Sequence, residues 1–190
     1  MRRPTEKTRQ NAMKRYVQNS LSDRIDHTKY PYRGVRIGYL GSQRDYNAFC
    51  DDYSFTLTTE NVPEEITDFT EEFCNGGNYP NIQRLIDFAE NDYTAHEERI
   101  DINAILNQAK EKGYRFSKKQ LRGTATYFWK YRDAYYKIAL LDKNYGIVND
   151  GEDAIVRFTH WKSPLFIVTN CGVAAILPVA SHLKNAIIIE

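Results

Sequence analysis

The chain of 190 residues is 42% apolar and 27% charged, which is typical of a folded globular protein and excludes a largely disordered chain. No apolar run approaches the roughly 20 residues that a membrane-spanning helix needs, and the charged N-terminus lacks the apolar stretch of a signal peptide. The three widely spaced cysteines, Cys50, Cys74 and Cys171, are typical of reduced thiols. We therefore expect a cytoplasmic protein without a membrane partner.

Charge is segregated along the chain. Residues 1–50 hold 11 basic and 4 acidic side chains, residues 51–101 hold 2 and 14, and residues 102–190 hold 13 and 7. The net charges are therefore +7, −12 and +6. Such asymmetry bears on binding partners rather than on fold. An exposed acidic segment favours a basic partner, whereas an acidic segment packed against its own basic flanks is neutralised internally. The sequence leaves both possibilities open.

The first elements are predicted from hydrophobic spacing and capping residues. Residues 5–22 fit a basic amphipathic helix whose apolar stripe includes Met13 and Tyr16. Residues 27–34 fit a loop, and residues 35–40 a short strand. Ser42 has the properties of an N-cap for a helix that runs to about Cys50, because an acid follows it three residues later.

An acidic helix is predicted over residues 63–74. Ile66, Phe69 and Phe73 have the spacing of a buried stripe, and acids occupy much of the remaining surface. Like charges four residues apart repel each other on a helix, so a helix that retains them is suited to a basic partner. A solvated acidic face is the alternative. The residues predicted to bind the partner are Glu64, Glu65, Asp68, Glu71 and Glu72.

The remaining elements alternate between helix and strand patterns. A Gly- and Pro-containing break at residues 74–80 precedes a helix around Ile86, and Asp101 is suited to cap a second helix that stops at Gly113. Residues 135–145 have helical spacing, and residues 170–172 predict a tight hairpin. The predicted strands are residues 124–129, 154–159, 165–169, 173–178 and 187–189.

These patterns predict an α+β protein, with a helical N-terminal part followed by a mostly antiparallel β-sheet module that packs one helix. We expect a mainly helical region at residues 1–115, which includes the acidic segment 51–101. A sheet module is expected at residues 116–190. The sequence contains no internal repeat.

The last third of the chain carries a family resemblance. Leu140-Leu141-Asp142, the segment 154–158, the run from Ser163-Pro164 to Val168 and the motif Ile176-Leu177-Pro178-Val179 follow one another. This order is similar to the C-terminal module of bacterial sliding clamps over residues 127–180. The resemblance implies a non-enzymatic module found where DNA is handled, with Leu177 and Pro178 beside a peptide-binding pocket. Clamps repeat the module and end at this motif, whereas here eleven residues follow Val179, so ring closure is not implied.

The overall style of the sequence also looks like small accessory proteins of phages and mobile elements, such as anti-CRISPR proteins. Such proteins often block a basic nucleic-acid channel with an acidic surface. The likeness is an analogy, because no motif carries it.

Aromatic and basic side chains alternate in two segments. Bases stack on exposed aromatic faces while neighbouring cations contact phosphates. Residues 127–137 show this mixture, and the loop at residues 27–34 repeats it. A strand followed by an amphipathic helix is the alternative explanation for residues 127–137. The predicted nucleic-acid contacts are Lys29, Tyr30, Tyr32, Arg33, Trp129, Lys130, Tyr131 and Arg132.

The catalytic patterns in the sequence are incomplete. The turn at residues 38–42 could hold phosphate at a helix N-terminus, but it lacks the lysine of a P-loop. Glu97, Glu98 and Asp101 could serve a metal-dependent nuclease. Cys171 and His160 could form a nucleophile–base pair, although nothing in the sequence would lower the thiol pKa. The four histidines lack zinc-site spacing.

The sequence therefore favours a non-enzymatic binding protein of a phage or mobile element, with no catalytic residue, metal or cofactor. Its expected partner is a nucleic-acid enzyme or complex, and inhibition of a host nuclease is the most concrete version. Nucleic acid is a second possible ligand. The alternatives are a metal-dependent nuclease or phosphoryl-handling enzyme, and a DNA-binding regulator that uses the basic helix at residues 5–22. The sequence shows no helix-turn-helix spacing that would support such a regulator.

Overall fold

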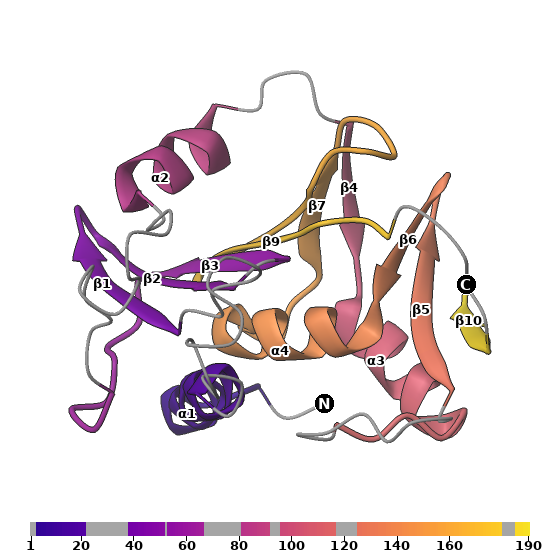
Figure 1. Cartoon of the computed structure of the whole chain (residues 1–190), viewed down its shortest axis with the longest axis horizontal. Coiled ribbons are helices and arrows are strands. Elements are labelled where there is room, and N and C mark those ends of the chain that lie inside the picture. Colours follow the sequence, from indigo (N-terminus) through magenta and orange to yellow (C-terminus); the bar gives the residue numbers. More distant parts are fainter. Residues whose placement is uncertain are drawn as a thin grey trace, which may run out of the picture.

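The computed structural model describes residues 3–21, 38–51, 53–66, 81–91, 96–116, 125–179 and 185–190. Within these residues the α+β class and the mostly antiparallel sheet are confirmed (Figure 1). The helices are α1 (Glu6–Leu21), α2 (Ile82–Glu90), α3 (Ile102–Glu111) and α4 (Ile138–Val148). The strands are β1 (Tyr39–Gln43), β2 (Tyr46–Asp51), β3 (Ser54–Thr58), β4 (His96–Ile100), β5 (Thr126–Tyr131), β6 (Ala134–Lys137), β7 (Ala154–Phe158), β8 (Leu165–Thr169), β9 (Gly172–Ile176) and β10 (Ala186–Ile189). None of the described helices is long and apolar enough to cross a bilayer.

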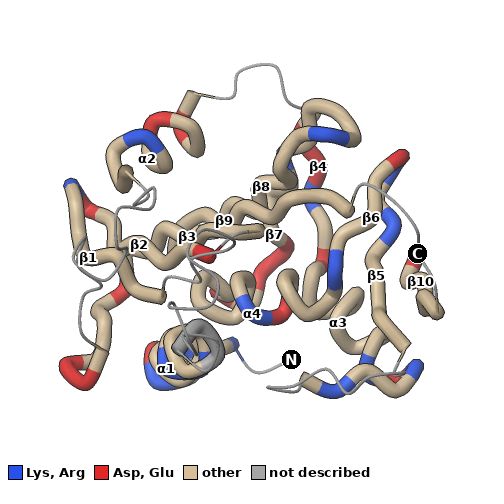
Figure 2. Tube along the Cα trace, viewed as in Figure 1, with Lys and Arg blue, Asp and Glu red and all other residues tan. Residues whose placement is uncertain are grey.

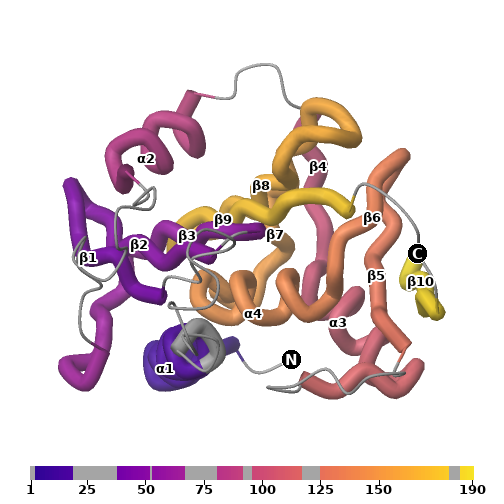
Figure 3. The backbone as a smooth tube through the Cα atoms, viewed as in Figure 1, coloured from indigo at the N-terminus to yellow at the C-terminus, as the bar shows by residue number. Residues whose placement is uncertain are grey.

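The large sheet has the order β1-β2-β3-β9-β8-β7-β4, and its neighbouring strands are antiparallel. It takes strands from both the 1–115 and the 116–190 regions, which meet where β4 pairs with β7 and, at the centre of the sheet, where β3 pairs with β9. Figure 3 shows β3 and β9 side by side in colours from distant parts of the chain. Helix α4 packs on one face with α1 beneath it, and α2 contributes to an apolar cluster on the other face. The small sheet has the order β10-β5-β6, in which β10 runs parallel to β5.

Helices α2 and α3 form where the sequence predicts them; the Asp101 cap was predicted, and the Asn81 cap is seen only in the structure. The side chain of Asn81 accepts a hydrogen bond from the backbone N–H of Arg84, and that of Asp101 accepts one from Ala104. Such caps satisfy N–H groups that have no partner within the helix. The helix expected at residues 135–145 begins instead at Ile138, because Tyr135 belongs to the edge strand β6.

The helix predicted from Ser42 to Cys50 is wrong, because this segment forms the β1–β2 hairpin. Its side chains alternate between two buried faces. Phe49 belongs to the core beside α4, whereas Ala48 and Cys50 belong to the apolar cluster beside α2. Burial on both faces stabilises a strand that short-range capping signals do not indicate.

The acidic helix predicted over residues 63–74 does not begin at Pro63. Glu64 and Glu65 lie in a turn that is followed by the buried Ile66, so residues 63–66 are not helical. Residues 67–74 lie outside the described residues, as does the predicted loop at residues 27–34.

A buried amide joins α4 to β3. Asn144 is fully buried, and its amide oxygen accepts a hydrogen bond from the Thr56 hydroxyl at 2.8 Å. Its amide nitrogen donates to the Ser54 hydroxyl at 2.9 Å and to the Leu140 carbonyl at 2.8 Å. Because every one of these partners is polar and covered, the network fixes the register of helix against strand.

Replacing Asn144 with leucine tests this network. Asn144→Leu leaves two buried hydroxyl groups without their amide partner, so we expect the free energy of unfolding to fall by about 2–4 kcal/mol. Urea denaturation measures the loss. The double variant Asn144→Leu/Thr56→Val removes one of the stranded hydroxyls and should recover part of the stability. A loss below about 0.5 kcal/mol, typical of a neutral surface change, would show that the network is not structural.

Gly172 permits the close junction of β3 and β9. Its φ is +141°, and a Cβ atom added there would lie 2.0 Å from the carbonyl oxygen of Leu57. Backbone cannot withdraw as a flexible side chain can, so no other residue fits without moving the two central strands.

Gly172→Ala should therefore reduce the free energy of unfolding by more than about 3 kcal/mol or abolish folding, because strain and overlap add. Gly38→Ala is the matched control, since its Cβ would make only ordinary 3.5 Å contacts with Val17. Thermal denaturation of both variants gives the comparison. Equal melting temperatures would contradict the assignment.

Candidate functional site

The basic N-terminal flank pairs with the acidic segment 51–101. Arg9 of α1 forms a salt bridge with Glu60 at 2.9 Å, and both side chains are largely covered. Lys14 of α1 contacts Glu65 at 2.7 Å near the surface. Arg44 in the β1–β2 turn lies 3.5 Å from Asp87 and 3.3 Å from Glu90 of α2. The first flank is therefore folded back onto the acidic segment.

The basic C-terminal flank also pairs with the acidic segment 51–101. Lys143 of α4 and Asp51 of β2 form a pair at 2.6 Å with both side chains nearly covered. Arg157 of β7 contacts Glu97 of β4 at 2.6 Å, and Arg132 contacts Glu98 at 3.7 Å. Figure 2 shows acidic and basic positions intermixed through the fold rather than gathered at opposite ends. Among the described residues, internal neutralisation explains much of the charge pattern.

The predicted acidic docking residues divide into two groups. Glu64 is exposed, and Glu65 is exposed but bound to Lys14, whose hydrogen bond lowers the pKa of the Glu65 carboxyl. Asp68, Glu71 and Glu72 lie outside the described residues. The structure thus gives an open acidic side chain only at Glu64 within this set.

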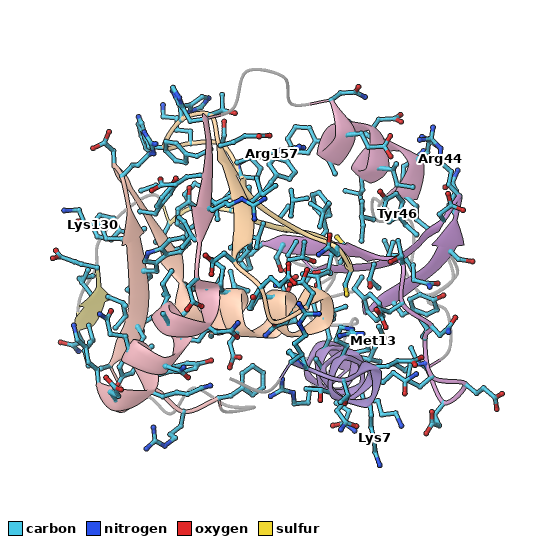
Figure 4. The ribbon with its side chains drawn as sticks, turned by 180° about the vertical axis from the view of Figure 1, so that it is seen from behind. Lys7, Met13, Arg44, Tyr46, Lys130 and Arg157 are labelled. Carbon is cyan, nitrogen blue, oxygen red and sulfur yellow. The ribbon has the colours of Figure 1, made fainter. Side chains whose placement is uncertain are left out.

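The predicted nucleic-acid contacts also divide. Lys29, Tyr30, Tyr32 and Arg33 lie outside the described residues. Trp129 and Tyr131 are only 3% and 7% exposed and pack against each other, with ring centroids 5.1 Å apart. Base stacking on these two rings is therefore a wrong prediction: the alternation of β5 directs them into the core. Lys130 and Arg132 remain at the surface, and Figure 4 shows Lys130 projecting outward.

The carboxylates considered for a nuclease do not converge. Glu97 and Glu98 are neighbours on β4, so their side chains point to opposite faces of the sheet. Glu97 binds Arg157, Glu98 accepts a hydrogen bond from the Tyr131 hydroxyl at 2.9 Å, and Asp101 caps α3. In the described part of the chain, no group of three or more His, Cys, Asp or Glu side chains could hold a metal ion.

Two other candidate sites from the sequence are not assembled in the structure. Strand β1 runs through Gly41 and Ser42, so the turn at residues 38–42 does not lead into a helix that could bind phosphate. His160 precedes β8, whereas Cys171 follows it, so the strand separates the supposed base from the supposed nucleophile. Burial, together with a hydrogen bond to Glu60, raises the pKa of the Cys171 thiol to about 11. Cys171 is thus a structural thiol.

Large apolar side chains are exposed at four positions among the described residues. Tyr53 is 52% exposed, Phe88 and Trp161 are 48% exposed, and Leu177 is 40% exposed. Phe88 packs part of its ring on the buried Phe166 of β8, with centroids 5.2 Å apart. Tyr53, Trp161 and Leu177 therefore remain as candidates for contact with a partner.

Tyr53 and Leu177 lie together. The backbone N–H of Leu177 donates to the carbonyl oxygen of Tyr53 at 2.9 Å, and the Lys137 ammonium lies 5.8 Å from the centre of the Tyr53 ring. We call these three residues the Tyr53 surface. Sequence patterns pointed to Leu177 through the clamp resemblance, but Tyr53 in a two-residue turn carried no signal of its own.

Comparison with known proteins finds no matching family model, no significantly similar curated protein and no significantly similar solved structure.

The raised pKa of Cys171 predicts slow alkylation. At pH 8 a thiol of pKa about 11 has about 100-fold less thiolate than one at the ordinary value of 9.0, and only the thiolate reacts. Iodoacetamide labelling of Cys171, followed by peptide mass spectrometry, should be at least that much slower in the native protein than in urea. The native rate should rise steadily as pH increases toward 11. Equal rates in both states would show that the thiol is accessible and reactive.

Proposed function

We propose that this chain is a non-enzymatic binding protein that docks on a nucleic-acid enzyme or complex through the Tyr53 surface. The observation that carries the proposal is the exposure, side by side, of two large apolar side chains from distant parts of the sequence. Inhibition of a host nuclease, as anti-CRISPR proteins achieve, is the most concrete form of this function.

The Tyr53 surface is held rigidly. The Asp51 carboxylate accepts a hydrogen bond from the backbone N–H of Tyr53 at 2.9 Å, and the same carboxylate binds Lys143 of α4. Leu177 directly follows β9, which pairs with β3 across the centre of the large sheet. A pre-ordered contact loses little entropy on binding, and a tyrosine beside an aliphatic side chain is a common energetic centre of protein interfaces.

The choice of partner class rests on two further features. The motif Leu177-Pro178 is the one whose counterpart in sliding clamps lies beside a peptide-binding pocket, which supports a protein ligand in a DNA-handling context. Glu64 presents an open carboxylate at the start of the acidic run 64–72. A basic nucleic-acid channel is the complementary surface for such a run.

The side chains considered for catalysis have other roles or lack the required chemistry, which supports binding over catalysis. Glu97 forms a salt bridge with Arg157 of β7, and Asp101 caps α3. The raised pKa of Cys171 disfavours the reactive thiolate.

The double variant Tyr53→Ala/Leu177→Ser tests the docking surface. Truncating an interface centre weakens binding by about 2 kcal/mol or more, roughly 30-fold in dissociation constant. Affinity capture from a host lysate, with identification of a nucleic-acid enzyme and titration of that purified enzyme, measures the loss. Trp161→Ala is the matched control, because Trp161 is similarly exposed but belongs to another turn.

Two outcomes would reject the proposed function. One is unchanged affinity of the double variant for the captured enzyme. The other is cleavage of labelled RNA or DNA by the purified protein with Mg²⁺ that disappears in Glu97→Ala.

A further inference from the structure

Trp161 is the exposed one of the chain's two tryptophans. It lies in the turn between β7 and β8, and nearly half of its surface is open, whereas Trp129 is buried in the core. Its indole offers a large apolar face together with a polar N–H group to solvent, which is suited to contact with a ligand.

The turn that carries Trp161 is ordered by its own hydrogen bonds. The backbone N–H of Lys162 donates to Nδ1 of His160 at 3.1 Å, and the backbone N–H of Ser163 donates to the His160 carbonyl at 2.8 Å. Pro164 follows and restricts the backbone at the start of β8. The ring is therefore presented on a fixed support, which we call the Trp161 turn (residues 160–163).

One cationic side chain lies over this ring, and a second lies near the end of β7. The Lys162 ammonium lies 4.7 Å from the centre of the Trp161 ring. The guanidinium of Arg132, in the β5–β6 turn, lies 5.9 Å from the ring centre of Phe158, the last residue of β7. The Trp161 turn and the tip of the β5–β6 hairpin thus lie at the same end of the molecule, at the top of Figure 1.

Glu97 and Glu98 of β4 are engaged at this end, whereas Asp133 at the tip of the β5–β6 hairpin is exposed. Glu97 pairs with Arg157 at 2.6 Å, and Glu98 contacts both Arg132 and the Tyr131 hydroxyl. The negative charge of these two carboxylates is therefore largely offset within the fold. Lys162 and Lys130, on the outer side of β5, are exposed cations.

We propose that this end of the molecule binds single-stranded nucleic acid, with one base stacked on Trp161 and an adjacent phosphate held by Lys162. An aromatic platform beside a cation binds any base through its π-face while the cation contacts the backbone. Lys162 lies over the indole, and nearly half of the Trp161 side chain remains exposed to a base.

A protein ligand fits this surface less well than a nucleic acid. Interface centres of proteins combine aromatic rings with other apolar side chains, as Tyr53 does with Leu177. Trp161 has the ammonium of Lys162 over its ring instead. The inference is independent of the proposed function, because the two surfaces use different residues.

Intrinsic fluorescence provides a direct test. Stacking quenches indole emission, and only Trp161 among the two tryptophans is accessible. Adding unlabelled dT12 or rU12 oligonucleotides at 50 mM salt should quench the emission of the full chain in a saturable manner. The buried Trp129 should dominate the emission of Trp161→Phe, and oligonucleotides should leave that emission unchanged.

Affinity measurements separate the contributions. By fluorescence anisotropy with a labelled dT12, Trp161→Ala should weaken binding by about 5- to 150-fold, the range typical of one stacked base. Trp161→Phe should retain most of the affinity. Lys162→Gln should reduce the slope of log affinity against log salt by about 0.7, the value for one phosphate contact on a single strand. Phe88→Ala, at a ring of equal exposure on α2, should bind as the unmodified chain does.

Three results would overturn the inference. The first is the absence of both quenching and anisotropy change at 50 mM salt. The second is equal loss of binding in Phe88→Ala and Trp161→Ala. The third is that Trp161→Ala weakens binding to the captured nucleic-acid enzyme while the unmodified chain does not bind oligonucleotides, which would make the Trp161 turn a protein interface.

Discussion

The placement of α4 depends on one covered polar contact, and both sheets depend on α4. Asn144 joins the helix to Thr56 and Ser54 of β3, and the adjacent Lys143 binds Asp51 while lying 4.0 Å from the ring centre of Tyr16 in α1. Helix α4 packs on β3 and β9 of the large sheet and on β5 and β6 of the small one. Loss of this contact would therefore loosen the Tyr53 surface, since Tyr53 directly precedes β3 and Leu177 directly follows β9.

Charge segregation in the sequence becomes charge complementarity in space. The basic flanks supply the partners of the acidic segment, from Arg9 with Glu60 to Arg157 with Glu97. These pairs range from the largely covered Arg9–Glu60 to the more exposed Lys14–Glu65, and together they offset the self-repulsion of a segment with net charge −12. The uncovered aromatic side chains of Tyr53 and Trp161 are then the candidates for contact with a partner.

Short-range sequence signals predicted the helices that short-range interactions stabilise. Asn81 and Asp101 cap their helices through bonds to residues three positions away, so the sequence was sufficient for α2 and α3. Strands β1 and β2 form because both faces of residues 46–50 are covered by elements distant in sequence, which no short window contains. The two tryptophans show the same limit: Trp129 and Trp161 both have basic neighbours in sequence, and only the packing of the strands decides which ring is exposed.

The pairing of β3 with β9 has a consequence for how the chain reaches this fold. Residues 54–58 pair with residues 172–176, so the centre of the large sheet joins the first third of the chain to its last tenth. Contacts between such distant residues slow folding, because closing the intervening chain costs conformational entropy before the strand pairing contributes stability. During synthesis the β1–β3 meander emerges with an open edge at β3, and that edge must wait for nearly the whole chain. A cell that makes this protein must therefore keep a growing intermediate with an unpaired strand from aggregating.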